Sequence, residues 1–258
     1  MAVKNPVFVG IEIINAPGRL RNAYVYAALD ETCQLLAIGR GDRAELLAFL
    51  GGQQSAWAAV NGPRRPNMGI HSHENPSQVG LPFEKPELPP NSRVCERLLA
   101  AEGFTLTPTP DKAADCTSWA RRSFDLYQQL TEFDYGDYPG SEGPRYSLET
   151  HPEIIFWRLL KGKLPLPASL EGRLQRQLIL YSLQMPVPDA MDFFLEVTRF
   201  KLIQGEVPDE KIFSIEELNA LAAAYIAWQA GNQSEDIDLI GDPEEGQIVL
   251  PARMISPL

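Results

Sequence analysis

Short apolar runs separated by turn residues dominate the N-terminal part of the chain. VFVGIEII, residues 7–14, is continuous and apolar except at Glu12, as expected for a strand that is buried on both faces. NAYVYAALD (22–30) and QLLAIG (34–39) follow, each after a short polar connection. Because short connections join antiparallel neighbours, the pattern predicts a three-stranded antiparallel meander.

A helix, a fourth strand and a long loop are predicted next. RAELLAFLGG (43–52) has apolar residues on one helical face and ends in glycine, a common helix stop. SAWAAV (55–60) is apolar and short, which predicts a strand that enters the sheet beside the first one through a helical crossover. Residues 62–91 are rich in proline, glycine and asparagine, and loops of this length are usually functional or mobile.

The remainder of the chain is predicted to be mainly helical. The last helix has the clearest start, because Ser214 and Glu217 form the Ser-x-x-Glu pattern of a capping box. The predicted elements are helices at 92–103, 117–130, 151–160, 169–203 and 214–231, and strands at 145–150 and, at an edge of the sheet, 247–251.

The order of these elements resembles that of the ribonuclease H fold. We therefore predict an α/β protein with a ribonuclease H-like mixed five-stranded sheet, in which three antiparallel strands precede the parallel ones, with flanking helices. Residues 1–258 are expected to form a single domain. A long loop and helical insertion is expected at about 62–144, and a helical insertion at about 158–212.

Composition is that of a folded protein. The chain is 44% hydrophobic and 22% charged, and no apolar run approaches the ~18 residues of a membrane span. The N-terminus lacks a signal-like pattern, so we predict a cytoplasmic protein without membrane binding. Cys33, Cys95 and Cys116 are widely spaced, which favours free thiols over disulfides or a zinc site.

The net charge and the absence of three sequence motifs argue against several classes of protein. A formal net charge of −11 repels nucleic acid at long range and argues against a general DNA-binding protein. It does not argue against a nuclease, because a metal-binding cleft is itself acidic. The patterns GxSxG, GxxxxGK[ST] and GxGxxG are absent, which argues against serine hydrolases, kinase-like enzymes and dehydrogenases.

Four stretches, in a consistent order over most of the chain, resemble a family of predicted nucleases with a ribonuclease H-like fold, whose function is inferred. They are FVGIE, AVNGPRRPN, LETHPEIIFWRLLKGKLP with GRLQR, and LNALAAAYIAWQAG with IGDPEEGQIVLP. In that fold, acidic residues from the first strand, the fourth strand and the last helix converge on Mg²⁺ or Mn²⁺. The metals activate water and stabilise the leaving oxygen in phosphodiester hydrolysis.

The resemblance places the acidic positions at Glu12, Asn61 and Asn219, and a further polar cluster at Glu149 and His151. The family usually has aspartate at the first three positions. Glutamate still ligates a metal, whereas the neutral oxygen of asparagine binds Mg²⁺ more weakly than a carboxylate. Two amides in one site are therefore expected to lower metal affinity and to weaken or abolish catalysis.

Other carboxylates offer substitutes. Glu216 and Asn219 are spaced so that they adjoin on one helical face, and a site of Glu12, Glu149 and Glu216 would restore three carboxylates. Alternatively, Glu216 is a first-turn residue favoured by the helix dipole. Glu12 differs, because a carboxylate inside an apolar strand is costly unless it is paired or ligated, and this favours a functional role.

Arginines near these positions have two interpretations. Arg64, Arg65 and Arg93, together with His151, are candidate substrate-binding residues, because guanidinium groups suit phosphate oxygens. The alternative is that the arginines pair with some of the 34 acidic residues, which are in excess.

Two further polar runs are interpreted as solvated surface. HSHE (71–74) has two histidines within a proline- and glycine-rich loop and no third histidine nearby in sequence. The acidic residues between 235 and 245 lack the spacing of a calcium loop.

Two functions follow from the sequence. The first is a metal-dependent nuclease or phosphodiester hydrolase that uses Mg²⁺ or Mn²⁺ and acts on nucleic acid or a nucleotide. Glu12 and Glu149 would then ligate the metal, and Asn61, Glu216 and Asn219 would complete the catalytic set. The second is a catalytically degenerate member that binds a nucleotide, nucleic acid or protein.

Overall fold

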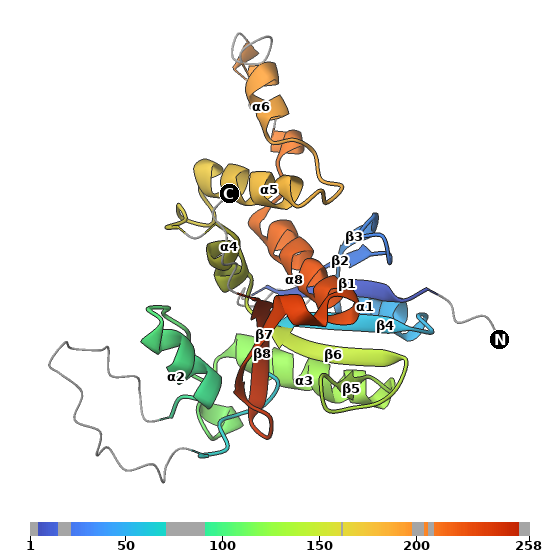
Figure 1. Cartoon of the computed structure of the whole chain (residues 1–258), viewed down its shortest axis with the longest axis vertical. Helices are drawn as coiled ribbons and strands as arrows, with labels where there is room; N and C mark the ends of the chain where they lie inside the picture. The colour runs from blue at the N-terminus through green and yellow to red at the C-terminus, as the bar shows by residue number, and fades with distance from the viewer. Residues whose placement is uncertain are drawn as a thin grey trace, which may run out of the picture.

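A mixed sheet with helices on both faces forms the centre of the molecule (Figure 1). The computed structural model describes residues 5–14, 22–70, 91–160, 162–197, 204–205 and 209–252. The helices are α1 (Arg43–Gly51), α2 (Val94–Ala101), α3 (Ser118–Glu132), α4 (Pro152–Leu160), α5 (Leu170–Ser182), α6 (Met191–Glu196) and α8 (Ile215–Asn232). Short 3₁₀ turns lie at Ala113–Asp115, Asp209–Lys211 and Ser234–Asp236.

Eight strands of the described residues make up the sheet, in the order β3-β2-β1-β4-β6-β8-β7, with β5 also paired to β6. β1, β2 and β3 form an antiparallel meander, β4, β6 and β8 continue the sheet in parallel, and β7 is antiparallel to β8. The strands are β1 (Val7–Ile13), β2 (Tyr24–Leu29), β3 (Leu35–Gly41), β4 (Ala56–Asn61), β5 (Gly136–Asp137), β6 (Arg145–Thr150), β7 (Ile237–Asp242) and β8 (Gly246–Pro251).

The predicted fold class is confirmed. The chain is an α/β protein whose mixed sheet of antiparallel and parallel strands, flanked by helices, is compatible with a ribonuclease H-like fold. α2 and α3 fall between β4 and β6, and α4, α5 and α6 fall between β6 and α8. In Figure 1, α6 stands away from the sheet, beyond α5.

Local sequence signals set several of the helix starts. Asp42 caps α1 and Ser214 caps α8, each as a complete capping box with a glutamate three positions later. The Ser214 hydroxyl accepts from the backbone N–H of Glu217, and the Glu217 carboxylate accepts from the backbone N–H of Ser214. The start of the last helix was therefore readable from the sequence alone.

The last helix packs closely on the centre of the sheet. A Cβ added to Gly10 of β1 would lie 2.0 Å from the carbonyl oxygen of Ala220 and 2.1 Å from the backbone nitrogen of Ala224. Glycine facing alanines removes the side-chain layer between strand and helix, so α8 approaches β1 at backbone distance. This contact fixes where polar residues in the first turns of α8 lie relative to β1.

Three sequence predictions need correction. The described part of the sheet has eight strands, where five strands and one further edge strand were predicted, because β5 and β7 were not predicted. The strand predicted at an edge is β8, which lies between β6 and β7. The single helical stretch predicted at 169–203 is divided into α5 and α6, since prolines at 186 and 188 interrupt it, and residues 198–203 lie outside the described part.

Among the described helices, none combines the length and apolarity needed to cross a membrane. The three cysteines are free thiols, as predicted.

Candidate functional site

Strand register brings Glu12 and Asn61 together at the carboxyl ends of two adjacent strands. Glu12 of β1 is the register partner of Asn61 of β4, which in turn is the partner of Thr150 of β6. Side chains alternate between the two faces of a sheet, and register partners point the same way. Gly10, two residues before Glu12, faces α8, so Glu12 and Asn61 also face α8.

Glu12 is the centre of a buried polar cluster. The Nδ2 of Asn61 donates a hydrogen bond of 2.6 Å to the Oε2 of Glu12, and the Asn219 side chain, from α8, also hydrogen-bonds to this carboxyl. Glu216 lies close enough that its charge acts on Glu12. The structure thus brings together the four predicted residues Glu12, Asn61, Glu216 and Asn219, which come from three separate elements.

The Glu12 carboxyl has a strongly shifted pKa. Burial raises its pKa from 4.5 to about 8; the hydrogen bonds from Asn61 and Asn219 oppose this rise, and the charge of Glu216 adds to it. Among the described residues, no cationic side chain offsets this burial, so the carboxyl is neutral at pH 7 when no cation is bound.

Glu216 has two kinds of neighbour. It lies in the first turn of α8, where the helix dipole stabilises a negative charge, and its carboxylate forms a 3.5 Å ion pair with Arg40 of β3. Both groups are partly exposed, so the pair contributes little to stability and leaves Glu216 accessible from solvent.

Substituting Glu12 is expected to change the pH dependence of stability. A group whose folded pKa is raised binds its proton more tightly in the folded state, so its contribution is lost as pH rises from about 4.5 to about 8. Glu12→Gln mimics the protonated carboxyl, and its free energy of unfolding should exceed that of the parent above pH 8 by on the order of 4–5 kcal/mol. Urea unfolding from pH 5 to 9 measures this difference.

The control is Glu132→Gln at an exposed position of α3. Its unfolding free energy should parallel that of the parent at every pH. Parallel curves for Glu12→Gln as well would contradict the raised pKa of Glu12.

Glu149 does not join the Glu12 cluster. It alternates with Leu148 and Thr150 on β6, and Leu148 packs in the core on the α8 side, so the Glu149 side chain points to the opposite face. Its two oxygens accept from the guanidinium of Arg93 at 2.5 and 2.9 Å, and its Oε2 also accepts from the backbone N–H of Arg64. The triad of Glu12, Glu149 and Glu216 is therefore not assembled in this structure.

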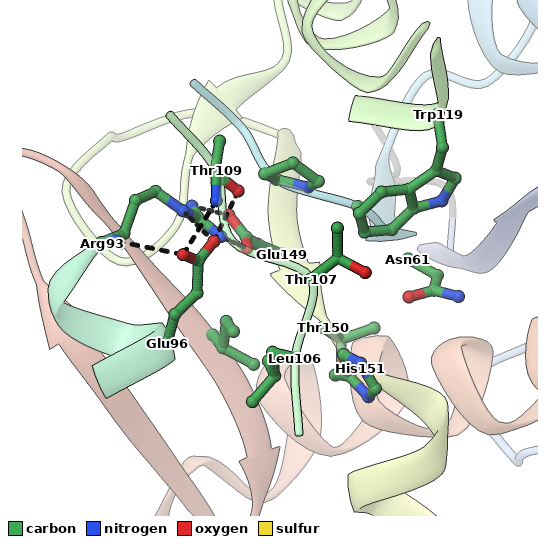
Figure 2. Close-up of a pocket in the computed structure, with 13 residues that line it drawn as sticks. Asn61, Arg93, Glu96, Leu106, Thr107, Thr109, Trp119, Glu149, Thr150 and His151 are labelled. Carbon is green, nitrogen blue, oxygen red and sulfur yellow. Dashed lines mark hydrogen bonds and ion pairs between the residues drawn. The ribbon is translucent and has the colours of Figure 1, made fainter. Parts of the chain in front are cut away.

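Arg93 belongs to a fully buried charge network (Figure 2). Its Nε donates to Glu96, while Nη1 and Nη2 donate to Glu149. Glu96 also accepts from the backbone N–H and hydroxyl of Thr109. Burial by itself would lower the pKa of Arg93, but the charge and hydrogen bonds of Glu149 raise it, so the guanidinium stays charged.

The other two candidate arginines are also paired. Arg64 forms an ion pair with Asp137, donates to the carbonyl oxygen of Ser147 and lies over the ring of Tyr127. Arg65 pairs with the same Asp137 at 3.1 Å. The alternative interpretation, in which these arginines pair with carboxylates, therefore holds for Arg64, Arg65 and Arg93.

A small cavity adjoins both polar clusters. Its volume is about 50 Å³, several times the space that one water molecule needs. Asn61 and His151 line it together with Arg93, Glu149 and Thr107; the remaining lining residues are Gly62, Pro63, Glu96, Leu106, Thr109, Trp119, Thr150 and Ile248. Figure 2 shows these side chains converging on the cavity.

His151 lies where β6 ends and α4 begins. Its backbone carbonyl accepts from the N–H groups of Ile154 and Ile155, which fixes the residue at the helix start. The Nδ1 atom is buried without a hydrogen-bond partner among the described residues. Burial lowers the pKa of His151, against the charges of Glu153 and Glu149, so the ring is neutral at pH 7.

The acidic run near the C-terminus is not only solvated surface. Glu245, in the turn between β7 and β8, is buried and accepts from the backbone N–H groups of Val94 and Met68. Asp238 pairs with the buried Arg158. The interpretation of this run as solvated surface was wrong for Glu245, which holds the start of α2. The histidines of the 71–74 run lie outside the described residues.

Sequence reasoning missed several carboxylates that pair with the candidate arginines or hold neighbouring segments, and of these Glu96 lines the cavity. Glu96 and Glu245 are buried, although neither belongs to a recognised sequence motif. Asp137 forms ion pairs with both Arg64 and Arg65. One local signal existed: Arg93 and Glu96 have the i, i+3 spacing of a helical ion pair. No pattern in the neighbouring sequence indicates that Glu245 pairs with Val94 and Met68, which are 151 and 177 positions away.

The chain is an α/β protein whose mixed sheet is compatible with a ribonuclease H-like fold. The buried polar cluster around Glu12 lies at the carboxyl ends of two strands of this sheet. The family described as protein of unknown function (DUF429) matches residues 70–245, more than half of the chain, and the chain belongs to this family. No curated protein and no solved structure matches it. The matched range includes His151, Glu216 and Asn219 but begins after Glu12 and Asn61.

Proposed function

We propose that this protein is a metal-dependent phosphodiester hydrolase, a nuclease of ribonuclease H type with a divergent acidic site. One observation carries the proposal: Glu12 accepts a hydrogen bond from Asn61 and contacts Asn219, with Glu216 nearby. A buried carboxylate at the carboxyl edge of a sheet, shared between two strands and one helix, is suited to holding a cation.

The residues of the cluster fit Mg²⁺ or Mn²⁺ as ligands. No group of three or more His, Cys, Asp or Glu that would hold a metal occurs in the described part of the chain. The cluster instead offers two carboxylates, Glu12 and Glu216, and two amide oxygens, Asn61 and Asn219, all of them hard donors. A divalent cation bound there would supply Lewis-acid activation of water and of the leaving oxygen.

The protein's own side chains would have to change state when a cation binds. Glu12, with a pKa of about 8, would release its proton at neutral pH. The Asn61 amide, whose Nδ2 now donates to Glu12, would rotate so that its Oδ1 faces the cation. Affinity for the cation is therefore expected to rise with pH up to about 8.

Nuclease assays with Mg²⁺ and Mn²⁺ on single- and double-stranded RNA and DNA test this proposal. Glu12→Ala should abolish cleavage, and Glu132→Ala, at an exposed position of α3, should retain it. Cleavage that survives Glu12→Ala would overturn the proposed mechanism.

A second candidate function is binding without hydrolysis. The observation that favours it is the amide at two of the positions, Asn61 and Asn219, beside a carboxyl that is neutral at pH 7 without a cation. Such a site retains hydrogen-bonding groups but has little charge with which to hold a metal. The protein would then recognise a nucleotide, a nucleic acid or a protein through the same edge of the sheet.

Restoring the two carboxylates distinguishes the candidates. Asn61→Asp with Asn219→Asp should raise Mn²⁺ affinity tenfold or more, because even at an effective dielectric of 20 two unit charges ~4 Å apart interact by about 4 kcal/mol. Isothermal titration calorimetry measures the affinity, and a cleavage assay follows activity. Newly created cleavage in an inert parent supports the binding module, whereas tight Mn²⁺ binding and cleavage by the parent support the hydrolase.

The matched control is Asn232→Asp at the exposed end of α8. It adds a charge on the same helix, away from Glu12, and should leave Mn²⁺ affinity unchanged. An equal gain for Asn232→Asp would show that the effect comes from net charge and not from the cluster.

A further inference from the structure

A larger cavity lies at the same edge of the sheet as the Glu12 cluster, but on the other face. Its volume is about 410 Å³, within the range of pockets that enclose drug-sized ligands. Tyr24 of β2 lines it and is the register partner of Ile13, the residue after Glu12. Because successive side chains of a strand point to opposite faces, Tyr24 lies on the face that α1 and α3 cover. The two cavities share no lining residue, so this is a separate candidate site.

Three elements supply the polar groups of the larger cavity. They are Tyr24 at the start of β2, Asp42 and Arg43 at the start of α1, and Arg122 and Asp125 of α3. Asp42 accepts from two backbone N–H groups of α1, and Arg122 donates at 2.9 Å to the backbone carbonyl that follows β1. Arg43 and Asp125 are exposed and have no ion-pair partner among the described residues. A ligand in the cavity can therefore bind to both.

The charges of the cavity favour a neutral polar ligand over a phosphate. The two guanidinium groups that line it are matched by two carboxylates, so the formal charges of these residues cancel. A phosphate held by Arg43 would be repelled by Asp125. Burial raises the pKa of Tyr24, so its hydroxyl keeps its proton, and the charges of Arg43, Arg122 and Asp125 all act on that hydroxyl. A donor, an acceptor and a hydroxyl thus lie around one point.

We propose that this cavity binds a guanine base, with the Asp125 carboxylate accepting from its N1–H and N2–H groups and Arg43 donating to O6 or N7. Guanine is the common base that presents two adjacent N–H donors on one edge, which suits the two oxygens of a carboxylate. Its O6 and N7 are the acceptors that arginine contacts most often in nucleic acids. The inference rests on the proposed function only in taking a nucleotide unit as the ligand. It does not require the Glu12 cluster to hold a cation.

Calorimetric titration of the full chain with guanosine, inosine and adenosine monophosphates, in EDTA, tests the inference. Inosine differs from guanosine only in lacking the N2 amino group, so it removes one of the two hydrogen bonds to Asp125. The parent should bind guanosine monophosphate about 10- to 100-fold more tightly than inosine monophosphate, as expected for one hydrogen bond to a charged group. Adenosine monophosphate should bind still more weakly, because adenine places the lone pair of N1 against the carboxylate.

The base can come from a free nucleotide or from a nucleic acid, and two further titrations distinguish these sources. Guanosine without its phosphate should keep most of the affinity, because the recognised groups lie on the base. An oligouridylate that carries one guanine is compared with the same oligomer carrying hypoxanthine at that position. A guanine preference in the mononucleotides identifies a free nucleotide as sufficient, whereas a preference seen only in the oligomers places the base in a nucleic acid.

Two variants assign the contacts. Asp125→Asn replaces one acceptor oxygen by a donor and should remove the preference for guanosine over inosine monophosphate. Arg43→Leu should weaken both nucleotides alike, because both keep O6 and N7. The matched control is Glu132→Gln, which removes an exposed carboxylate about two turns later on α3 and should leave both affinities unchanged. Thermal midpoints within a few degrees of the parent show that the variants are folded.

Equal affinity of the parent for the three nucleotides, or no binding of any nucleotide or oligomer, would overturn the inference. So would a guanine preference that persists in Asp125→Asn. Mn²⁺-dependent cleavage is measured separately, so a guanine preference in EDTA without cleavage would refute the hydrolase and retain the guanine site. Cleavage without a guanine preference would do the reverse.

Discussion

Arg93→Met should lower the free energy of unfolding by about 3–5 kcal/mol, since removing one partner of a buried ion pair leaves uncompensated charge in the interior. Arg93 is 2% exposed and satisfies both Glu96 and Glu149, which are 2% and 3% exposed. Methionine fills similar space, so the loss reflects charge pairing more than cavity formation. Urea unfolding at pH 7 gives the value.

The matched control is Arg97→Met, one turn later on the exposed face of α2. It removes the same charge from the same helix and should change stability by less than about 0.5 kcal/mol. Adding Glu149→Gln to Arg93→Met should recover part of the lost free energy of unfolding, because one of the two unpaired carboxylates is then replaced by a neutral amide. A loss below about 1 kcal/mol for Arg93→Met would contradict the buried network.

Gly10→Ala should destabilise the protein by about 3 kcal/mol or more, because overpacking against backbone cannot be relieved by a rotamer change. The added Cβ would lie 2.0 Å from the carbonyl oxygen of Ala220, so α8 would have to move away from β1. That movement would also separate Asn219 from Glu12. We therefore expect lower Mn²⁺ affinity together with a lower thermal midpoint.

Gly140→Ala is the control for the backbone change itself. The nearest atom to its added Cβ is the carbonyl oxygen of Asp137 at 4.0 Å, so no clash arises. Its thermal midpoint should stay within a few degrees of that of the parent. Comparable midpoints for Gly10→Ala and Gly140→Ala would show that α8 is not held at backbone distance.

The candidate site was predictable where it depends on chain order. Glu12 stood out as a carboxylate in an apolar strand, and Asn61 as the polar residue at a strand end. The order of elements, with the resemblance to predicted nucleases, placed both beside Asn219 of the last helix. The structure brings these three residues and Glu216 together.

The role of the other polar residues was not predictable in the same way. Glu149 lies at the end of a strand, as Asn61 does, but it projects from the opposite face and pairs with Arg93. Arg64 and Arg65 were candidate phosphate ligands, yet they share Asp137. Sequence could raise pairing as an alternative without naming any of the partners.

By itself the sequence determined where most strands and helices lie, because their signals act over a few residues. These signals are the spacing of apolar residues, the glycines that end helices and the capping boxes that start them. It also determined that Glu12 needs a partner. Tertiary structure alone decided which partner each charge has, since Arg93 meets Glu149 across 56 positions and Val94 meets Glu245 across 151. Such pairs depend on strand register and on the distance of α8 from the sheet, and both are set by packing of the whole core.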